Sequence, residues 1–290
     1  MARSSPGVKR ITSTLTFLAQ HPHDSFTLSE LCRELGLSPA TAHAQLNALV
    51  ADGFLLREPA SRRYSLGPAL IEIGVAAAAR QGQVLEYARS ELKGLAAELG
   101  RQCVITQVIG DRIVILDREG RLGRLGTTVE VGQRLPFEPP LGTVFLAWSD
   151  SESIEDWLRG VAPKTSAKAI AECVRQVRLV RERRYSVSLS VDSPHLPLHG
   201  GRKEDEPIGL IELLESHYFL DTIDEKGSYE VQQIAAPVFD SGGQVIVAVC
   251  VLYFGTAITG KQLRADAAEV IAAAERVTKT IHGHCPNPVD

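Results

Sequence analysis

The sequence lacks any long hydrophobic run, any low-complexity tract and any clear leader segment. Its longest apolar stretch, residues 245–254, has about half of the roughly 20 residues that a membrane-spanning helix needs. Residues 11–20 are interrupted by threonine and serine and lack a small-residue cleavage site, unlike a signal peptide. These absences argue against a membrane-spanning protein and predict a chain without membrane contact.

The motifs of common catalytic sites are missing too. There is no Gly-x-Ser-x-Gly elbow, no phosphate-binding P-loop and no Gly-x-Gly-x-x-Gly fingerprint. His195 and His199 have the spacing of two zinc ligands on a helix, but Pro197 between them excludes the helical geometry. The histidines and the cysteine of residues 282–285 lie in a tail that we expect to be frayed. The sequence therefore predicts no enzyme, no cofactor and no metal site.

The cysteines do not form a disulfide framework, because five is an odd number and they are widely spaced. They are Cys32, Cys103, Cys173, Cys250 and Cys285. Most of them lie in apolar stretches, so we expect free, buried thiols in a reducing cytoplasm.

Length and charge favour two domains of different character. A chain of 290 residues is long for one small core. The formal net charge of −4 argues against a protein that coats nucleic acid without sequence preference. Residues 1–66, however, hold seven Lys and Arg against five Asp and Glu, a balance of +2, which leaves −6 for the rest. This mild asymmetry permits a DNA-binding N-terminus.

Three short helices are predicted near the N-terminus. Apolar residues at helical spacing predict a helix over 8–20. Thr27-Leu28-Ser29-Glu30 has the form of a capping box, and Gly36 suits the left-handed end of the helix that follows. Ser38-Pro39 then begins a third helix that ends at about Ala51. Two helices joined by so short a turn form a helix-turn-helix.

A hairpin is expected after the third helix. Phe54 to Arg57 and Tyr64 to Leu66 suit short strands around the polar turn of residues 58–63. A three-helix unit closed by such a hairpin is a winged helix. The alternative is a three-helix bundle that serves protein contacts.

The exposed side of the third helix supplies candidate DNA contacts, because the N-terminal part of a recognition helix enters the major groove. With Ala42, Leu46 and Leu49 buried, its polar residues can meet phosphates or base edges. On the helix these residues are Ser38, Thr41, His43, Gln45 and Asn47. On the wing and elsewhere they are Arg62, Arg63, Arg57 and Arg10. Each has a simpler alternative as a solvated surface residue.

Motifs in a consistent order make the chain similar to a known family. They are Thr41-Ala42-His43, Tyr64-Ser65-Leu66-Gly67, Val131-Gly132-Gln133-Arg134-Leu135-Pro136, Leu141-Gly142 and Ile234-Ala235-Ala236-Pro237-Val238. With this order and spacing, the sequence resembles the IclR family of bacterial transcription regulators from about residue 8 to residue 282.

The resemblance implies a winged helix over 1–66, a linker helix over 67–82 and a GAF-like sensor domain over 83–290. It implies an α/β (α+β) fold in which a central antiparallel sheet is flanked by helices. It also implies cytoplasmic homodimers or homotetramers that bind a palindromic double-stranded DNA operator. Such regulators repress or activate transcription under the control of a small-molecule effector.

The chain departs from the family pattern at positions that affect DNA binding and at positions that affect effector binding. Ala40 and Ala44 stand where the recognition helix usually carries lysine or arginine, which predicts a shallow salt dependence of DNA binding. Gln233 stands where a cysteine is common, and Cys250 and Leu252 replace small hydroxyl residues. These changes predict a larger or more apolar effector than a simple keto acid.

The rest of the chain is expected to mix helices and strands. Helices are predicted over 67–80, 84–99, 141–148, 167–184 and 262–281, and strands over 103–109, 113–117, 231–239 and 245–254. The turn at Gly110-Asp111 makes the early sheet antiparallel. The segment between residues 185 and 232 is longer than is usual in the family.

A central sheet with helices on both flanks is an architecture in which a ligand cavity is expected. The family resemblance implies an effector site with these residues in its walls: Phe137, Leu141, Gly142, Phe145, Gln233, Ala235, Cys250 and Leu252. Each of them could instead belong to an ordinary core.

Two other functions stay open. The sensor domain could bind no small molecule and serve only assembly, and a cavity filled by Phe145 and Leu252 would favour this reading. The chain could also be an enzyme or an interaction module that carries a winged helix. Turnover of a metabolite that is insensitive to changes at Thr41 and His43 would favour the enzyme.

Overall fold

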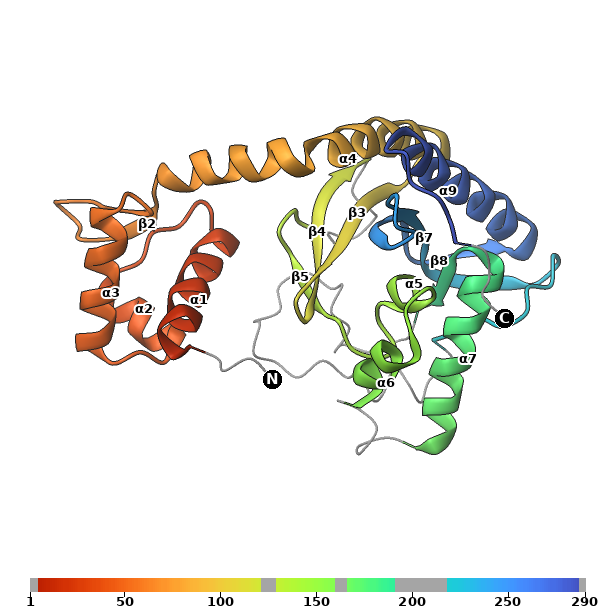
Figure 1. Cartoon of the computed structure of the whole chain (residues 1–290), viewed down its shortest axis with the longest axis horizontal. Coiled ribbons are helices and arrows are strands. Elements are labelled where there is room, and N and C mark those ends of the chain that lie inside the picture. The colour runs from red at the N-terminus through yellow and green to blue at the C-terminus, as the bar shows by residue number, and fades with distance from the viewer. Residues whose placement is uncertain (1–4, 121–128, 160–165, 191–217, 287–290) are drawn as a thin grey trace. The chain divides into compact units, whose positions relative to one another are not determined.

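A computed structural model describes residues 5–120, 129–159, 166–190 and 218–286. The chain divides into two compact units, residues 1–82 (the N-terminal unit) and 83–290 (the C-terminal unit) (Figure 1). Much of the long segment between residues 185 and 232 lies outside the described residues, and with it His195, Pro197 and His199.

The described part of the N-terminal unit contains three short helices and a hairpin. They are α1 (Pro6–Gln20), α2 (Leu28–Leu35), α3 (Pro39–Ala51), β1 (Leu55–Arg57) and β2 (Tyr64–Leu66). β1 and β2 are antiparallel, and Phe26 adds a single bridge to Tyr64. Buried side chains from all five elements form one core, which includes Leu18, Leu31, Leu46, Leu55 and Tyr64. This is the winged helix that the sequence predicted.

Local signals set the ends of α2 and α3. The Thr27 hydroxyl accepts from the Glu30 N–H at 3.3 Å, and the Glu30 carboxylate accepts from the Thr27 N–H at 2.7 Å, which completes the predicted capping box. Gly36 takes the left-handed conformation, with φ 62°, and ends α2. Ser38 then caps α3, with Pro39 in its first turn.

One helix, α4 (Ala69–Leu99), stands where two helices were predicted over 67–80 and 84–99. Alanines 76–79 are strong helix formers, and a single glycine such as Gly82 costs a helix only about 1 kcal/mol. That cost is too small to end a helix whose neighbours favour it on both sides. The prediction of a break was therefore wrong.

The described part of the C-terminal unit contains a six-stranded sheet. Its strands are β3 (Gln102–Ile109), β4 (Arg112–Glu119), β5 (Arg134–Pro136), β6 (Ser186–Leu189), β7 (Ser228–Phe239) and β8 (Val245–Thr259). Their order is β5-β4-β3-β8-β7-β6, and every neighbouring pair is antiparallel. The short strands β5 and β6 were not predicted, because three or four residues show too little alternation to be recognised.

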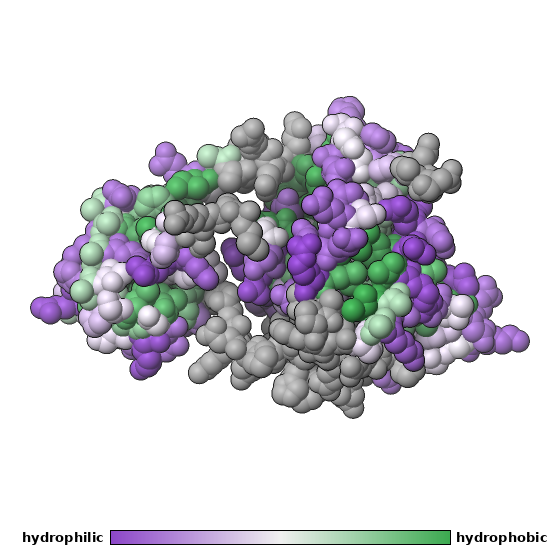
Figure 2. Space-filling model, turned by 60° about the horizontal axis from the view of Figure 1, so that its bottom comes forward, coloured by the Kyte–Doolittle hydropathy of each residue, from purple (hydrophilic) through white to green (hydrophobic). Residues whose placement is uncertain are grey.

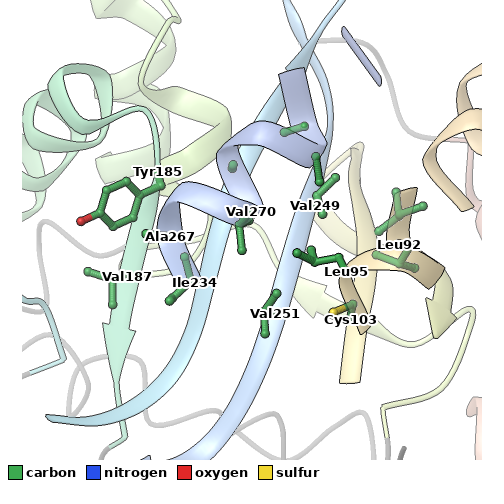
Figure 3. Close-up of a cluster of buried hydrophobic side chains, with 14 of the residues drawn as sticks. Leu92, Leu95, Cys103, Tyr185, Val187, Ile234, Val249, Val251, Ala267 and Val270 are labelled. Atoms are coloured by element: carbon green, nitrogen blue, oxygen red, sulfur yellow. The ribbon is translucent and has the colours of Figure 1, made fainter. Parts of the chain in front are cut away.

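Helices cover both faces of this sheet. Those that follow α4 are α5 (Thr143–Leu146), α6 (Ser151–Arg159), α7 (Ala167–Arg183) and α9 (Gly260–Thr280). One face packs on α9 and on the C-terminal part of α4, where Leu92, Leu95 and Val270 meet Val249 and Val251 of β8 (Figure 3). The opposite face packs on α5, which α7 contacts in turn. We call these the α9 face and the α5 face.

The helix predicted over 141–148 is shortened to α5. Gly142 has φ 92°, outside the helical range, directly before the first helical residue. A regular helix therefore cannot include Leu141. The sequence pattern of apolar residues does not reveal this kink, because the residues on both sides of it are buried.

The surface of the face shown in Figure 2 is mostly hydrophilic, with hydrophobic patches on both units. Large exposed apolar side chains include Val8 of α1 and Ile71 and Val75 of α4. No helix in the described ranges is both long and apolar enough to cross a membrane. All five cysteines are free, as their odd number and wide spacing predicted, and Cys103, Cys173 and Cys250 are buried, as the apolar stretches around them predicted.

Candidate DNA interface and effector site

α3 buries an apolar side and exposes a polar one. Ala42, Leu46 and Leu49 are buried within the N-terminal unit. The outward positions of the helix and its cap are Ser38, Pro39, Ala40, His43, Ala44 and Asn47, which are exposed, and Thr41, which is half-buried. The accessible side of α3 therefore carries hydroxyl, imidazole and amide groups, between which Ala40 and Ala44 present only methyl groups.

Hydrogen bonds hold these polar groups in pairs. The Ser38 and Thr41 hydroxyl oxygens are 2.8 Å apart, and Asn47 Nδ2 lies 3.3 Å from His43 Nδ1. Neither pair uses all of its donors and acceptors. Both pairs can therefore bond phosphate oxygens or base edges.

Gln45 lies on a different side of the helix. Its Nε2 donates to Thr14 Oγ1 of α1 at 2.9 Å. Thr14 is fully buried, and its hydroxyl donates in turn to the Arg10 carbonyl at 2.9 Å. The Gln45 amide thus fixes α3 on α1, and the DNA contact that the sequence predicted for it stays a prediction.

Two of the three predicted arginines of the hairpin are exposed. Arg62 lies in the wing turn with φ 57°, and its N–H donates to the Glu58 carbonyl at 2.9 Å. The Arg57 guanidinium lies 5.6 Å from the ring centroid of Tyr64. Within the described part of the chain neither arginine forms an ion pair. Their charges are therefore available to phosphates.

Arg63 is held inside the unit instead. Its Nε donates to the Ser25 carbonyl at 2.9 Å, and its Nη2 pairs with Glu30 Oε2 at 3.1 Å. The Thr27 N–H and hydroxyl, and then the charge of Arg63, hold the pKa of the Glu30 carboxyl below its usual value. Arg63 thus ties the wing to the start of α2, and its contact with phosphate stays a prediction.

Arg10 of α1 is exposed, next to a residue that the sequence analysis did not select. Arg10 and Lys9 line a small cavity of about 220 Å³ together with Leu35 and Leu37 of the α2–α3 turn. Two cations therefore lie beside the turn that begins α3. Lys9 was missed because nothing in its local sequence distinguishes it from a solvated lysine.

Four of the predicted effector residues face one another on the β7–β8 hairpin. Gln233 lies opposite Leu252, and Ala235 lies opposite Cys250. Alternate residues of a strand point to the same side, so all four lie on the α5 face. Ala235, Cys250 and Leu252 are at most 3% exposed and belong to one buried cluster.

The other four residues come from the segment that leads into α5. Leu141 and Phe145 belong to the same cluster, and Phe137 packs against it with its ring centroid 6.4 Å from that of Phe145. Gly142 lies against the Phe137 ring, since a Cβ atom at this position would come within 2.5 Å of Phe137 Cε2. Six of the eight residues, all except Gly142 and Gln233, thus belong to or pack against one buried cluster on the α5 face.

The polar groups that border this cluster are uncharged. Thr106 Oγ1 lies 3.6 Å from Cys250 Sγ. Ser188, opposite Gln233 on β6, is 5% exposed, and its hydroxyl makes no hydrogen bond of normal geometry with a described atom. Burial raises the pKa of Cys250 to about 11 and that of Tyr218 to about 12, so both groups are neutral at physiological pH. Sequence reasoning missed Ser188 and Tyr218, which lie on either side of the long segment.

Comparison with known sequences supports a regulator. The family model described as MarR family matches residues 12–63, which is the winged helix alone. The glycerol operon regulatory protein of Streptomyces griseus is 40% identical over 74 residues. That match covers 26% of this chain and 29% of the relative, so it spans under a third of that protein's length.

Solved structures match nearly the whole chain. The IclR transcriptional regulator from Alicyclobacillus acidocaldarius matches with a TM-score of 0.67 at 24% identity, over 96% of this chain and 100% of that one. The chain has the fold of the IclR-family regulators. An IclR homolog from Microbacterium hydrocarbonoxydans, complexed with 4-hydroxybenzoate, matches with a TM-score of 0.64 at 16% identity, over 95% of this chain and 98% of that one.

The likeness to solved IclR structures confirms the fold class that the sequence motifs predicted and agrees with the family that these motifs resemble. It accounts for the winged helix and for the antiparallel sheet with helices on both faces in a single architecture. The matched proteins are transcriptional regulators and not enzymes.

Proposed function

We propose that this chain is a sequence-specific DNA-binding transcriptional regulator whose operator binding responds to a small molecule. The exposed polar side of α3 carries the proposal, because Thr41, His43 and Asn47 are accessible on a helix that is capped and well packed. Arg62 of the wing and Arg10 of α1 supply exposed cations for the phosphates on either side of a groove.

Selection from a random duplex library tests the proposal with the full chain. We expect a palindromic motif, because a symmetric pair of winged helices contacts two equal half-sites. The double variant Thr41→Ala, His43→Ala should bind the selected duplex at least about tenfold more weakly, since a good base contact is worth about 1–3 kcal/mol.

The matched control combines His23→Ala with Thr280→Ala, which removes the same side chains at exposed positions outside α3 and the wing. This control should bind the selected duplex like the parent chain. If no motif is enriched, or if the Thr41 and His43 variant binds as well as the control, α3 is not a recognition helix.

The proposed effector has an apolar body and few, neutral polar groups. The α5 face supports this, because Leu141, Phe145 and Leu252 dominate the cluster and its polar neighbours Thr106 and Cys250 are uncharged. The IclR homolog complexed with 4-hydroxybenzoate supports a small organic ligand in this fold. Operator binding measured against a panel of compounds tests the idea, and a response to small acids alone would contradict it.

The proposed assembly is a cytoplasmic homodimer, or a pair of dimers, on a palindromic operator. The exposed apolar side chains of Val8, Ile71 and Val75 support self-association of the N-terminal unit. An effector that favours one arrangement of the two winged helices changes their fit to half-sites about one helical turn apart. Light scattering on the purified chain tests the assembly, and a monomer at the concentrations that bind DNA would contradict it.

One observation favours a second candidate, in which the C-terminal unit serves assembly and binds no effector. Phe145 and Leu252 are both buried in the same cluster, so the chain's own side chains occupy the α5 face. Under this function, operator binding would still depend on Thr41 and His43 but would not respond to any small molecule.

A further inference from the structure

The C-terminal unit has a cavity that lies apart from the eight predicted effector residues. Its volume is about 390 Å³, and it lies between β7, α9 and the segment after α9. Its apolar lining consists of Ala236, Pro237, Phe239, Ile271 and Ala274. None of these residues belongs to the cluster on the α5 face. A concave apolar surface with a few polar groups at its edge is typical of small-molecule sites.

The segment after α9 is a fixed wall of this cavity and not the frayed tail that the sequence predicted. The Gly283 N–H donates to the Thr278 carbonyl at 2.7 Å, and the His284 N–H donates to the Asp240 carbonyl at 3.2 Å. Gly283 fits so closely that a Cβ atom there would lie 1.8 Å from the Phe239 carbonyl oxygen. The cavity therefore has a defined shape on this side.

The polar edge of the cavity carries an excess of positive charge. Arg184 pairs with Glu275, so these two charges compensate each other. Lys279 is exposed and has no ion-pair partner among the described residues. His284 and the Thr278 hydroxyl add possible hydrogen-bond donors at the same edge. The edge thus suits one anionic group, and the apolar lining suits a compact hydrocarbon body.

We propose that this cavity is a second small-molecule site, which binds monocarboxylates with a compact apolar body. The carboxylate bonds the Lys279 ammonium at the edge, and the body lies on Phe239 and Ile271. A charge-assisted hydrogen bond is the stronger kind, so the lysine selects acids over alcohols of the same shape. The site is independent of the proposed DNA contacts and of the effector residues on the α5 face.

A tryptophan beside the cavity makes ligand binding there measurable by fluorescence. The Trp148 ring stacks edge-to-face on Phe239 with the centroids 4.9 Å apart, and the Cys285 thiol lies beside the same indole. The other tryptophan, Trp157, donates its indole N–H to the Leu141 carbonyl next to the α5 face. The two tryptophans therefore distinguish ligands at the two sites.

Fluorescence titration of the full chain with hexanoate and benzoate tests the proposal, with 1-hexanol and benzyl alcohol as uncharged controls. We expect both acids to change the emission of the parent chain in a saturable way and the alcohols to bind more weakly. Trp148→Phe should remove the response. Lys279→Ala should weaken the binding of both acids by about tenfold, which is the expected contribution of one charge-assisted hydrogen bond.

Lys261→Ala is the matched control, because Lys261 is exposed at the other end of α9. It should bind both acids like the parent, and Lys279 is exposed too, so neither variant is expected to unfold. The proposal is overturned if neither acid changes the emission. It is also overturned if the response survives Trp148→Phe, or if Lys279→Ala and Lys261→Ala bind equally, because the acids then occupy another site.

Discussion

Glu30 joins three parts of the winged helix through one carboxylate. It completes the capping box with Thr27, it lies in the first turn of α2, and it pairs with the Arg63 guanidinium from the wing. Two of these contacts are stronger when the carboxylate is charged. The packing of the hairpin on α2 therefore depends on the ionisation of a single residue.

We predict that the hairpin and α2 lose stability when Glu30 is protonated. The pKa of Glu30 is lowered in the folded chain, so its contribution is fully present above the unfolded value of about 4.3. This contribution is lost as the pH falls through the folded value. Glu30→Gln keeps a capping side chain but loses the charge, so its hydrogen-exchange protection in residues 26–37 should be lower at pH 7 and less dependent on pH.

Glu34→Gln is the control, because Glu34 lies on the same helix and, among the described residues, pairs with the exposed Arg33 alone. Its protection, corrected for intrinsic exchange rates, should follow the parent chain from pH 7 to pH 3. Equal pH profiles for Glu30→Gln and the parent would show that another acid governs the hairpin.

Individual residues also show which features of the site the sequence could not predict. Thr41, His43 and Arg62 are accessible as the helical pattern and the turn predicted. Gln45 and Arg63 are half-buried and already bonded within the fold, to partners 31 and 33 residues away in the chain, Thr14 and Glu30. A helical pattern says which side of a helix is polar, but not which polar residue already has a partner within the fold.

Among the elements, the turn at Gly142 decides the shape of the α5 face. Its φ of 92° lets the chain turn sharply into α5, and the Phe137 ring occupies the space where a side chain would be. Leu141 and Phe145 can then enter the same cluster from the two sides of this glycine. Only glycine can adopt this φ and also leave room for the Phe137 ring without strain.

We predict that Gly142→Ala destabilises the C-terminal unit by about 1–3 kcal/mol, because a left-handed alanine is strained and its Cβ collides with Phe137. Urea unfolding followed by tryptophan emission measures the change, since Trp157 bonds the Leu141 carbonyl. Gly94→Ala, in the exposed middle of a helical segment with no atom within 4 Å of the new Cβ, should instead stabilise by about 0.5–1 kcal/mol. A change in the free energy of unfolding with the same sign for both variants would contradict this account.

The elements that could be predicted are those whose ends are coded locally. The capping residues of α2 and α3 and the long apolar runs of β7 and β8 define their elements without help from the rest of the chain. The uninterrupted α4 and the three-residue strand β5 could not be predicted in this way. Tertiary contacts, and not local sequence, decide a strand as short as β5, whereas a single glycine is too weak a local signal to end α4.

At the scale of the whole molecule, the C-terminal unit includes more than the sheet and the helices around it. Ala88, Leu92 and Leu95 of α4 are buried against the α9 face. The second half of α4 is therefore part of the core of this unit, although it is continuous with the helix that leaves the winged helix.

We predict that residues 83–290 fold without the N-terminal unit and that residues 101–290 do not. The shorter fragment lacks Leu92 and Leu95, and loss of a buried leucine side chain costs about 2–5 kcal/mol. Two such losses are comparable with the whole stability of a domain, about 5–15 kcal/mol. Circular dichroism and urea unfolding measure both fragments, and a cooperative transition in the shorter one would refute the prediction.

Under the proposed function, the methyl groups of Ala40 and Ala44 have a consequence for how the chain acquires new target genes. Both side chains are exposed and lie outside the buried cluster of the N-terminal unit, whereas Gln45 bonds Thr14 of α1. Longer side chains at positions 40 and 44 would add base contacts at little cost in stability. In a chain with the proposed function, promoter choice can therefore diverge through two adjacent turns of α3 while the rest of the winged helix stays constant.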